Sequence, residues 1–132
     1  NGLFKTIDSG FSWEEVNTAG SFIKGSQSPS LFFSDGNHGY ISDNTKISKT
    51  NNGGFNWNLI YTGSSTYHDV QFINDNLGYI TDGKYLLKTT DSGATWQKVV
   101  TLGADSFIEL HFTDANHGWA GTAGGSVLRY QQ

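Results

Sequence analysis

The chain has 132 residues and a formal net charge of −4, from eight Lys and Arg against 12 Asp and Glu. Charged residues make up 15% and aromatic residues 14% of the sequence, which excludes a disordered chain. The basic residues are scattered, so no nucleic acid partner is expected. The absence of cysteine excludes disulfides and thiolate metal sites.

Short strands joined by tight turns are expected along the whole chain. The 17 glycines and the single proline, Pro29, suit many turns because glycine adopts positive φ at no steric cost. In chain order, residues 1–20 contain two predicted strands, residues 30–62 and 67–101 four each, and residues 107–130 three. In the second four-strand unit these strands are 67–73, 78–82, 85–89 and 95–100. No segment has the apolar spacing of three and four that helices require.

Two sequence blocks recur with a period of about 40 residues. The first block has Lys-Thr, then Asp or Asn, Gly and Trp, and spans residues 3–13, 47–57 and 86–96. The second begins with Phe and ends with Gly followed by Tyr or Trp, and spans residues 33–40, 72–79 and 112–119. Four short strands in each unit of this length predict the blades of a β-propeller.

The first block matches the pattern Ser/Thr-x-Asp-x-Gly-x-Thr-Trp, and the sequence resembles the Asp-box, or bacterial neuraminidase repeat, family over nearly all its length. With the second block, the unit is most similar to the photosystem II assembly factor family and its bacterial relatives. The resemblance implies an all-β fold of four-stranded antiparallel meanders, and rings of roughly six to ten blades. About three repeats are too few for such a ring, so the segment is expected to be open or completed by self-association.

The box residues are predicted to be structural. They are Asp8, Gly10 and Trp13; Asn52, Gly54 and Trp57; and Asp91, Gly93 and Trp96. The Asp carboxylate accepts hydrogen bonds from turn amides, Gly takes a left-handed conformation, and Trp packs against the apolar side of the blade. The amide oxygen of Asn52 still accepts such a bond. All three tryptophans are expected to be buried.

No catalytic residues are predicted. Sialidases of this family clamp the substrate carboxylate with three arginines, and Arg129 is the sole arginine here. Hydrolysis of other glycosides needs only two carboxylates. The alternative to a non-enzyme is therefore a fragment of a glycoside hydrolase propeller, for which Asp69 and Glu109, which align between repeats, are the weak candidate pair.

The resemblance places ligand binding on the face opposite the boxes. The candidate ligand-binding residues there are Asp43, Asp82, Tyr67 and Asp69. Asp43 and Asp82 share one blade position, where capping of the turn is the simpler interpretation. His38 and His117 also share a turn position, but Leu77 fills it in the middle unit. No metal site and no cofactor are therefore predicted.

A non-catalytic binding or scaffold module is thus expected, with a protein or a glycan as ligand. The longest connection, residues 17–30, carries Phe22 and Ile23, which are either buried or a contact. The sequence has no apolar run of transmembrane length, so no membrane insertion is expected. The missing initial Met and the many Asn, Ser, Thr, Gly and Tyr residues favour a secreted or cell-envelope protein or an excised domain.

The phase of the repeats predicts self-association, because the first and last blades are both incomplete. The simplest arrangement is a two-fold dimer of about six blades, in which the Trp13 hairpin completes the 107–130 blade of its partner. The competing interpretation is that the chain is a fragment of one longer propeller.

Overall fold

The computed structural model describes residues 2–16, 30–43, 45–63 and 69–131. The described residues form thirteen strands in four antiparallel sheets, and no helix occurs among them. The predicted all-β fold of propeller blades is confirmed. No helix in this part of the chain is long and apolar enough to cross a membrane.

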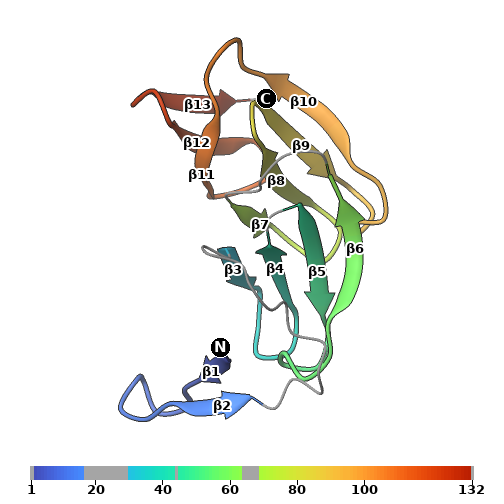
Figure 1. The fold of residues 1–132 in the computed structure, drawn as a ribbon, viewed down its shortest axis with the longest axis vertical. Coiled ribbons are helices and arrows are strands. Elements are labelled where there is room, and N and C mark those ends of the chain that lie inside the picture. Colours follow the sequence, from blue (N-terminus) through green and yellow to red (C-terminus); the bar gives the residue numbers. More distant parts are fainter. Residues whose placement is uncertain (1, 17–29, 44, 64–68, 132) are drawn as a thin grey trace.

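The sheets follow one another along the chain, and each is a meander in which consecutive strands pair (Figure 1). The first sheet has β1 (Leu3–Lys5) and β2 (Glu14–Val16); the second has β3 (Ser30–Phe33), β4 (Gly39–Asp43), β5 (Lys46–Thr50) and β6 (Asn58–Thr62). The third has β7 (Val70–Phe72), β8 (Gly78–Asp82), β9 (Tyr85–Thr89) and β10 (Gln97–Thr101); the fourth has β11 (Phe107–Phe112), β12 (His117–Thr122) and β13 (Val127–Gln131). The leading strands β3, β7 and β11 lie along one side of the molecule, and β6 and β10 lie along the other (Figure 1).

Each Asp-box forms the turn between the last two strands of its sheet. In the β9–β10 turn, Asp91 accepts hydrogen bonds from the backbone N–H of Thr95 at 2.9 Å and from its hydroxyl at 2.6 Å. The Thr89 hydroxyl oxygen accepts the N–H of Gly93, whose φ is +89°. Asn52 in the middle box accepts the N–H of Asn56 at 3.0 Å, so an amide oxygen is sufficient for this turn.

The turns between the first two strands of the blades are also closed by a side-chain oxygen. Asp35, Asn74 and Asp114 stand at the same position and each accepts two backbone N–H groups. His38 and His117 bond through Nδ1 to the Asp of their own turn, at 2.7 and 2.9 Å. The second repeated block is therefore an Asx-type turn that a leucine also fits.

Successive blades are joined by aromatic stacks. Tyr40 of β4 stacks on Phe72 of β7, with ring centroids 3.5 Å apart and planes at 7°. One blade later, Tyr79 of β8 stacks on Phe112 of β11 at 3.9 Å and 6°. All four rings are nearly inaccessible to solvent, and they form the centre of the two largest apolar clusters.

The expectation that all three box tryptophans are buried is wrong for Trp13. Trp57 is 7% exposed, Trp96 is half-buried and Trp13 is 61% exposed. Trp57 and Trp96 set their ring edges against Phe33 and Phe72, on the leading strand of their own blade. The two-stranded sheet β1–β2 has no leading strand among the described residues, so Trp13 has no such ring to cover it.

Candidate functional site

The predicted ligand-binding residues do not form a group of available carboxylates. Tyr67 lies outside the described residues, as do Phe22, Ile23 and the side chain of Asp43. The side chains of Asp69 and Asp82 are described, and each has a different environment.

Asp69 links three blades. One carboxylate oxygen accepts the hydroxyl of Ser30, at the start of β3, at 2.6 Å, and the backbone N–H of Val70 at 2.8 Å. The other accepts the backbone N–H of Leu110, in β11, at 2.8 Å. The carboxylate is therefore occupied by structural hydrogen bonds.

Gln71 extends this connection by two residues and was not singled out from the sequence. Its amide oxygen accepts the N–H of Phe112 at 2.7 Å, and its amide nitrogen donates to the carbonyl of Phe112 at 2.9 Å. The side chains of Asp69, just before β7, and of Gln71, in β7, are thus bonded to the backbone of β11. The only sequence signal is that the repeats differ here, with Phe32 and His111 at the corresponding positions.

Asp82 is buried at the end of β8, with 3% of its surface exposed, and its Oδ1 has no hydrogen-bond partner. The adjoining turn is bonded to the next segment, because the carbonyl of Gly83 accepts the N–H of Phe107 and the carbonyl of Lys84 accepts that of Leu102. This carboxylate is therefore enclosed by the turn rather than presented to a ligand.

The exposed aspartates of the turns are held ionised by their hydrogen bonds. Side-chain and backbone hydrogen bonds from Ser12 lower the pKa of Asp8 to about 2, and those from Thr95 do the same for Asp91. Backbone hydrogen bonding from Asn37, with the His38 ring, lowers the pKa of Asp35 to about 2. A general acid needs the opposite shift, toward neutral pH.

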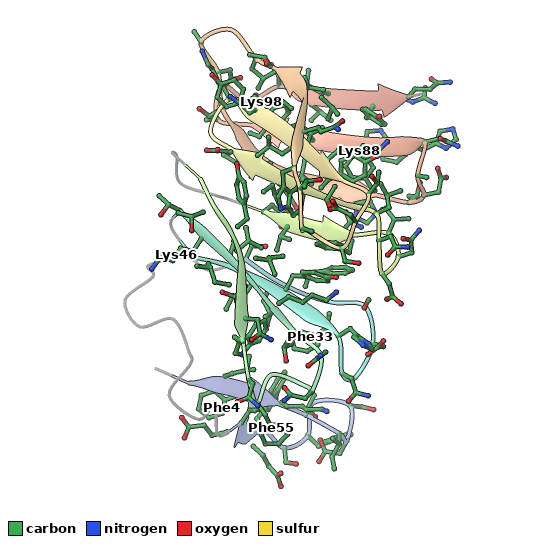
Figure 2. The ribbon with its side chains drawn as sticks, turned by 90° about the vertical axis from the view of Figure 1, so that its right-hand side faces the viewer. Phe4, Phe33, Lys46, Phe55, Lys88 and Lys98 are labelled. Carbon is green, nitrogen blue, oxygen red and sulfur yellow. The ribbon has the colours of Figure 1, made fainter. Side chains whose placement is uncertain are left out.

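A compact basic spot lies on the outer part of the β7–β10 blade. The Nζ atoms of Lys98 and Lys84 lie 3.6 and 5.5 Å from the centroid of the Tyr85 ring. Both lysines are exposed and the ring is half-buried. Lys46 and Lys98 lie on one side of the molecule and Lys88 on the other (Figure 2). Lys88 caps Tyr79 at 5.7 Å instead.

Two apolar cavities lie between neighbouring sheets, one near each end of the chain. A cavity of about 270 Å³ opens between the β1–β2 sheet and β3, lined by Trp13, Leu31 and Phe33 among others. A second, of about 210 Å³, lies between the last two blades and includes Val100 and Leu128. Exposed apolar side chains gather at the N-terminal end of the molecule, including Phe4 of the first sheet and Phe55 of the β5–β6 turn (Figure 2).

The described residues contain no group of three or more His, Asp or Glu that could hold a metal ion. Among the four histidines, His38 and His117 contact the Asp of their own turns, and His111 is exposed on β11. His68 lies outside the described residues.

No protein-family model matches the sequence, and no curated protein matches it. Among solved structures, the chain is similar to YCF48 from Cyanidioschyzon merolae, with a TM-score of 0.77 and 16% identity over 99% of this chain and 44% of that one. It is also similar to YCF48 in a structure bound to D1 peptide, with a TM-score of 0.64 and 24% identity over 76% of this chain and 35% of that one. The chain thus spans less than half of either structure. Its fold matches part of the propeller of YCF48, a photosystem II assembly factor with Asp-box repeats.

Proposed function

We propose that the chain is a non-catalytic, protein-binding segment of an Asp-box β-propeller. The observation that carries this proposal is that the candidate carboxylates are hydrogen-bonded within the fold or buried. Hydrolysis of a glycoside needs two carboxyl groups facing one cleft, one of them protonated near neutral pH. Asp69 is bonded to the neighbouring blades, and Asp82 is enclosed. The same blade presents a cationic and aromatic group, formed by Lys84, Tyr85 and Lys98, which suits binding rather than hydrolysis.

The ligand that fits the spot formed by Lys84, Tyr85 and Lys98 is an acidic peptide segment. Two ammonium groups beside one ring can bind a carboxylate, and the ring offers apolar area to the adjacent side chain. The solved structure of YCF48 with the D1 peptide supports a peptide as the class of ligand, since the fold is shared over 76% of this chain. A neutral glycan makes no use of the two charges.

Fluorescence anisotropy with a labelled peptide of alternating Glu and Ser tests this proposal. Lys98→Ala is expected to weaken binding at least about tenfold, because one charge-assisted hydrogen bond contributes roughly 1.5 to 3 kcal/mol. Lys88→Ala is the matched control, since Lys88 also lies beside a tyrosine ring but on the other side of the molecule. Equal weakening by both variants would mean non-specific charge attraction. Binding to neutral glycans on an array, with no binding to the peptide, would contradict the proposal.

A further inference from the structure

The interface between successive blades occurs twice inside the chain, and the two examples show which residues form it. Each blade presents an outgoing face, which includes the aromatic side chain of its second strand. The next blade presents an incoming face on its leading strand. The β3–β6 blade meets the β7–β10 blade in this way, and that blade meets β11–β13. The exposure of equivalent residues shows where such a contact is missing.

The outgoing face of the last blade is uncovered. Tyr40 and Tyr79, which stack on the following blade, are 2% and 0% exposed. Trp119 stands at the same position, after the glycine that pairs with the Phe of the leading strand, and it is 39% exposed. Ile108, on β11 of the same blade, is 45% exposed.

The incoming face of the β3–β6 blade is covered only in part, because Leu3 and Val16 of the β1–β2 sheet pack beside Phe33 and leave the rest of the face open. Val70 and Leu110, two residues before the Phe of their leading strands, are 2% and 6% exposed, whereas Leu31 at this position is 48% exposed. Phe72 and Phe112 each receive a stacked ring. Phe33 receives the edge of Trp57, and no stacked ring among the described residues.

The polar groups of the two faces also correspond. In the internal interface, Asp69 and Gln71 bond to the backbone of Leu110 and Phe112. The residues aligned with Asp69 and Gln71 on the last blade are Glu109 and His111, and both are exposed. On the first complete blade, Leu31 and Phe33 align with Leu110 and Phe112, so their backbone groups hold the corresponding positions. A carboxylate and an imidazole can each accept a backbone N–H.

We propose that the outgoing face of one chain binds the incoming face of a second copy, with Trp119 stacked on Phe33 and Glu109 bonded to the backbone of Leu31. The occupant is a second copy because both halves of the interface are on this chain and each has the chemistry that the other needs. The contact is heterologous, and such contacts close into a ring when the rotation between copies allows it. With β3, β7 and β11 from each copy, two copies give about six blades, within the range of known propellers.

Ring closure brings β1 of one copy and β13 of the other to the same place, since both are third strands of a blade. The β1–β2 turn carries a complete Asp-box, while β13 has Arg129-Tyr130 at the positions where the boxes have Lys-Thr. Tyr130 meanwhile packs 5.5 Å from Phe112, where a box tryptophan packs in the other blades. In the assembly, β13 yields to β1 of the second copy, and Trp13 replaces Tyr130 against Phe112.

Sedimentation velocity between about 1 and 100 μM, a range typical of weak specific association, tests the proposal. We expect a species of twice the 14.4 kDa chain mass. Leu31→Asp and Trp119→Lys, at exposed positions that leave the fold intact, are each expected to raise the dissociation constant at least tenfold. Leu59→Asp is the matched control, because Leu59 is 57% exposed on the outer strand β6. Circular dichroism confirms that each variant is folded.

Two further variants separate head-to-tail exchange from other dimers. Tyr130→Thr is expected to tighten association, because it weakens the hold of β13 on the single chain and removes nothing from the assembly. Mixing the Leu31→Asp and Trp119→Lys chains restores one intact interface and hence a weak heterodimer. A chain that stays monomeric at 100 μM would overturn the proposal, as the faces would then serve other blades. The proposal would also be overturned if Trp119→Lys disrupted the dimer and Leu31→Asp did not. Such a result would mean that the two copies meet through the same face, in an isologous contact.

Discussion

Gly78 lies directly beneath the ring of Phe72, and we expect that it does not tolerate a methyl group. A Cβ at Gly78 would lie 2.6 Å from this ring. The ring is also stacked on Tyr40 at 3.5 Å and contacted at its edge by Trp96, so it cannot move away. Overpacking of this kind costs about 1 to 3 kcal/mol, and loss of the stack about 0.5 to 1.5 kcal/mol more. Gly78→Ala should therefore lower the free energy of unfolding by roughly 2 to 4 kcal/mol.

Gly39 provides the control, because its local geometry is nearly the same. A Cβ there would lie 2.7 Å from the ring of Phe33. Among the described residues no ring stacks on Phe33, so this ring can shift into the open part of the incoming face, beside Leu31. We expect Gly39→Ala to cost less than about 1 kcal/mol, since part of the strain is offset by the lower entropy of the unfolded chain.

Urea denaturation at low micromolar protein, followed by circular dichroism, measures both changes. The two variants should keep the wild-type slope and differ in midpoint, with Gly78→Ala much the lower. Equal destabilisation would refute the reasoning, because it would mean that the stack on Phe72 does not restrict its movement. Under conditions where copies associate, Gly39→Ala should weaken the association, since Phe33 is then covered.

Three other changes follow from the same contacts. The hydrogen-bonded box turn lowers the pKa of Asp91 from 3.8 to about 2, so the ionised carboxylate stabilises the fold above pH 4, and this contribution is lost as the pH falls from about 4 to 2. Asp91→Asn should flatten the acid unfolding curve in that window. Trp57→Ala should cost about 3 to 5 kcal/mol and Trp13→Ala far less in the single chain, as measured by urea midpoints. Gln71→Leu should cost about 1 to 3 kcal/mol, and Gln97→Leu, at an exposed position, close to nothing.

The features that the sequence predicted well are local ones. An Asp-box turn is determined by residues within a few positions of one another, so Asp91 and Gly93 have the roles expected of them. The strands were also predictable, because short runs of β-forming residues between turn residues adopt the extended conformation that their local sequence favours. Asn52 keeps its role because turn geometry depends on an acceptor and not on charge.

The features that could not be predicted depend on which blades are neighbours. Trp13 closes the same Asp-box pattern as Trp96, but its exposure depends on the leading strand of its sheet, which is not among the described residues. Asp69 was noted as a candidate ligand residue and is a link between blades, because its partners, Ser30 and Leu110, are 39 and 41 residues away. No pattern within one repeat contains that information.

Differences between the repeats are a better guide to function on this scaffold than the number of acids. Every blade needs oxygen acceptors for its turn amides, so carboxylates such as Asp35 and Asp114 accumulate on the box face for structural reasons. The Tyr85–Lys98 spot has no such explanation, because the equivalent positions of the β3–β6 blade hold Lys46 and Leu59. The blade does not need Tyr85 with its two neighbouring lysines in order to fold. Side chains of this kind, added to a repeated scaffold, are typical of a binding site.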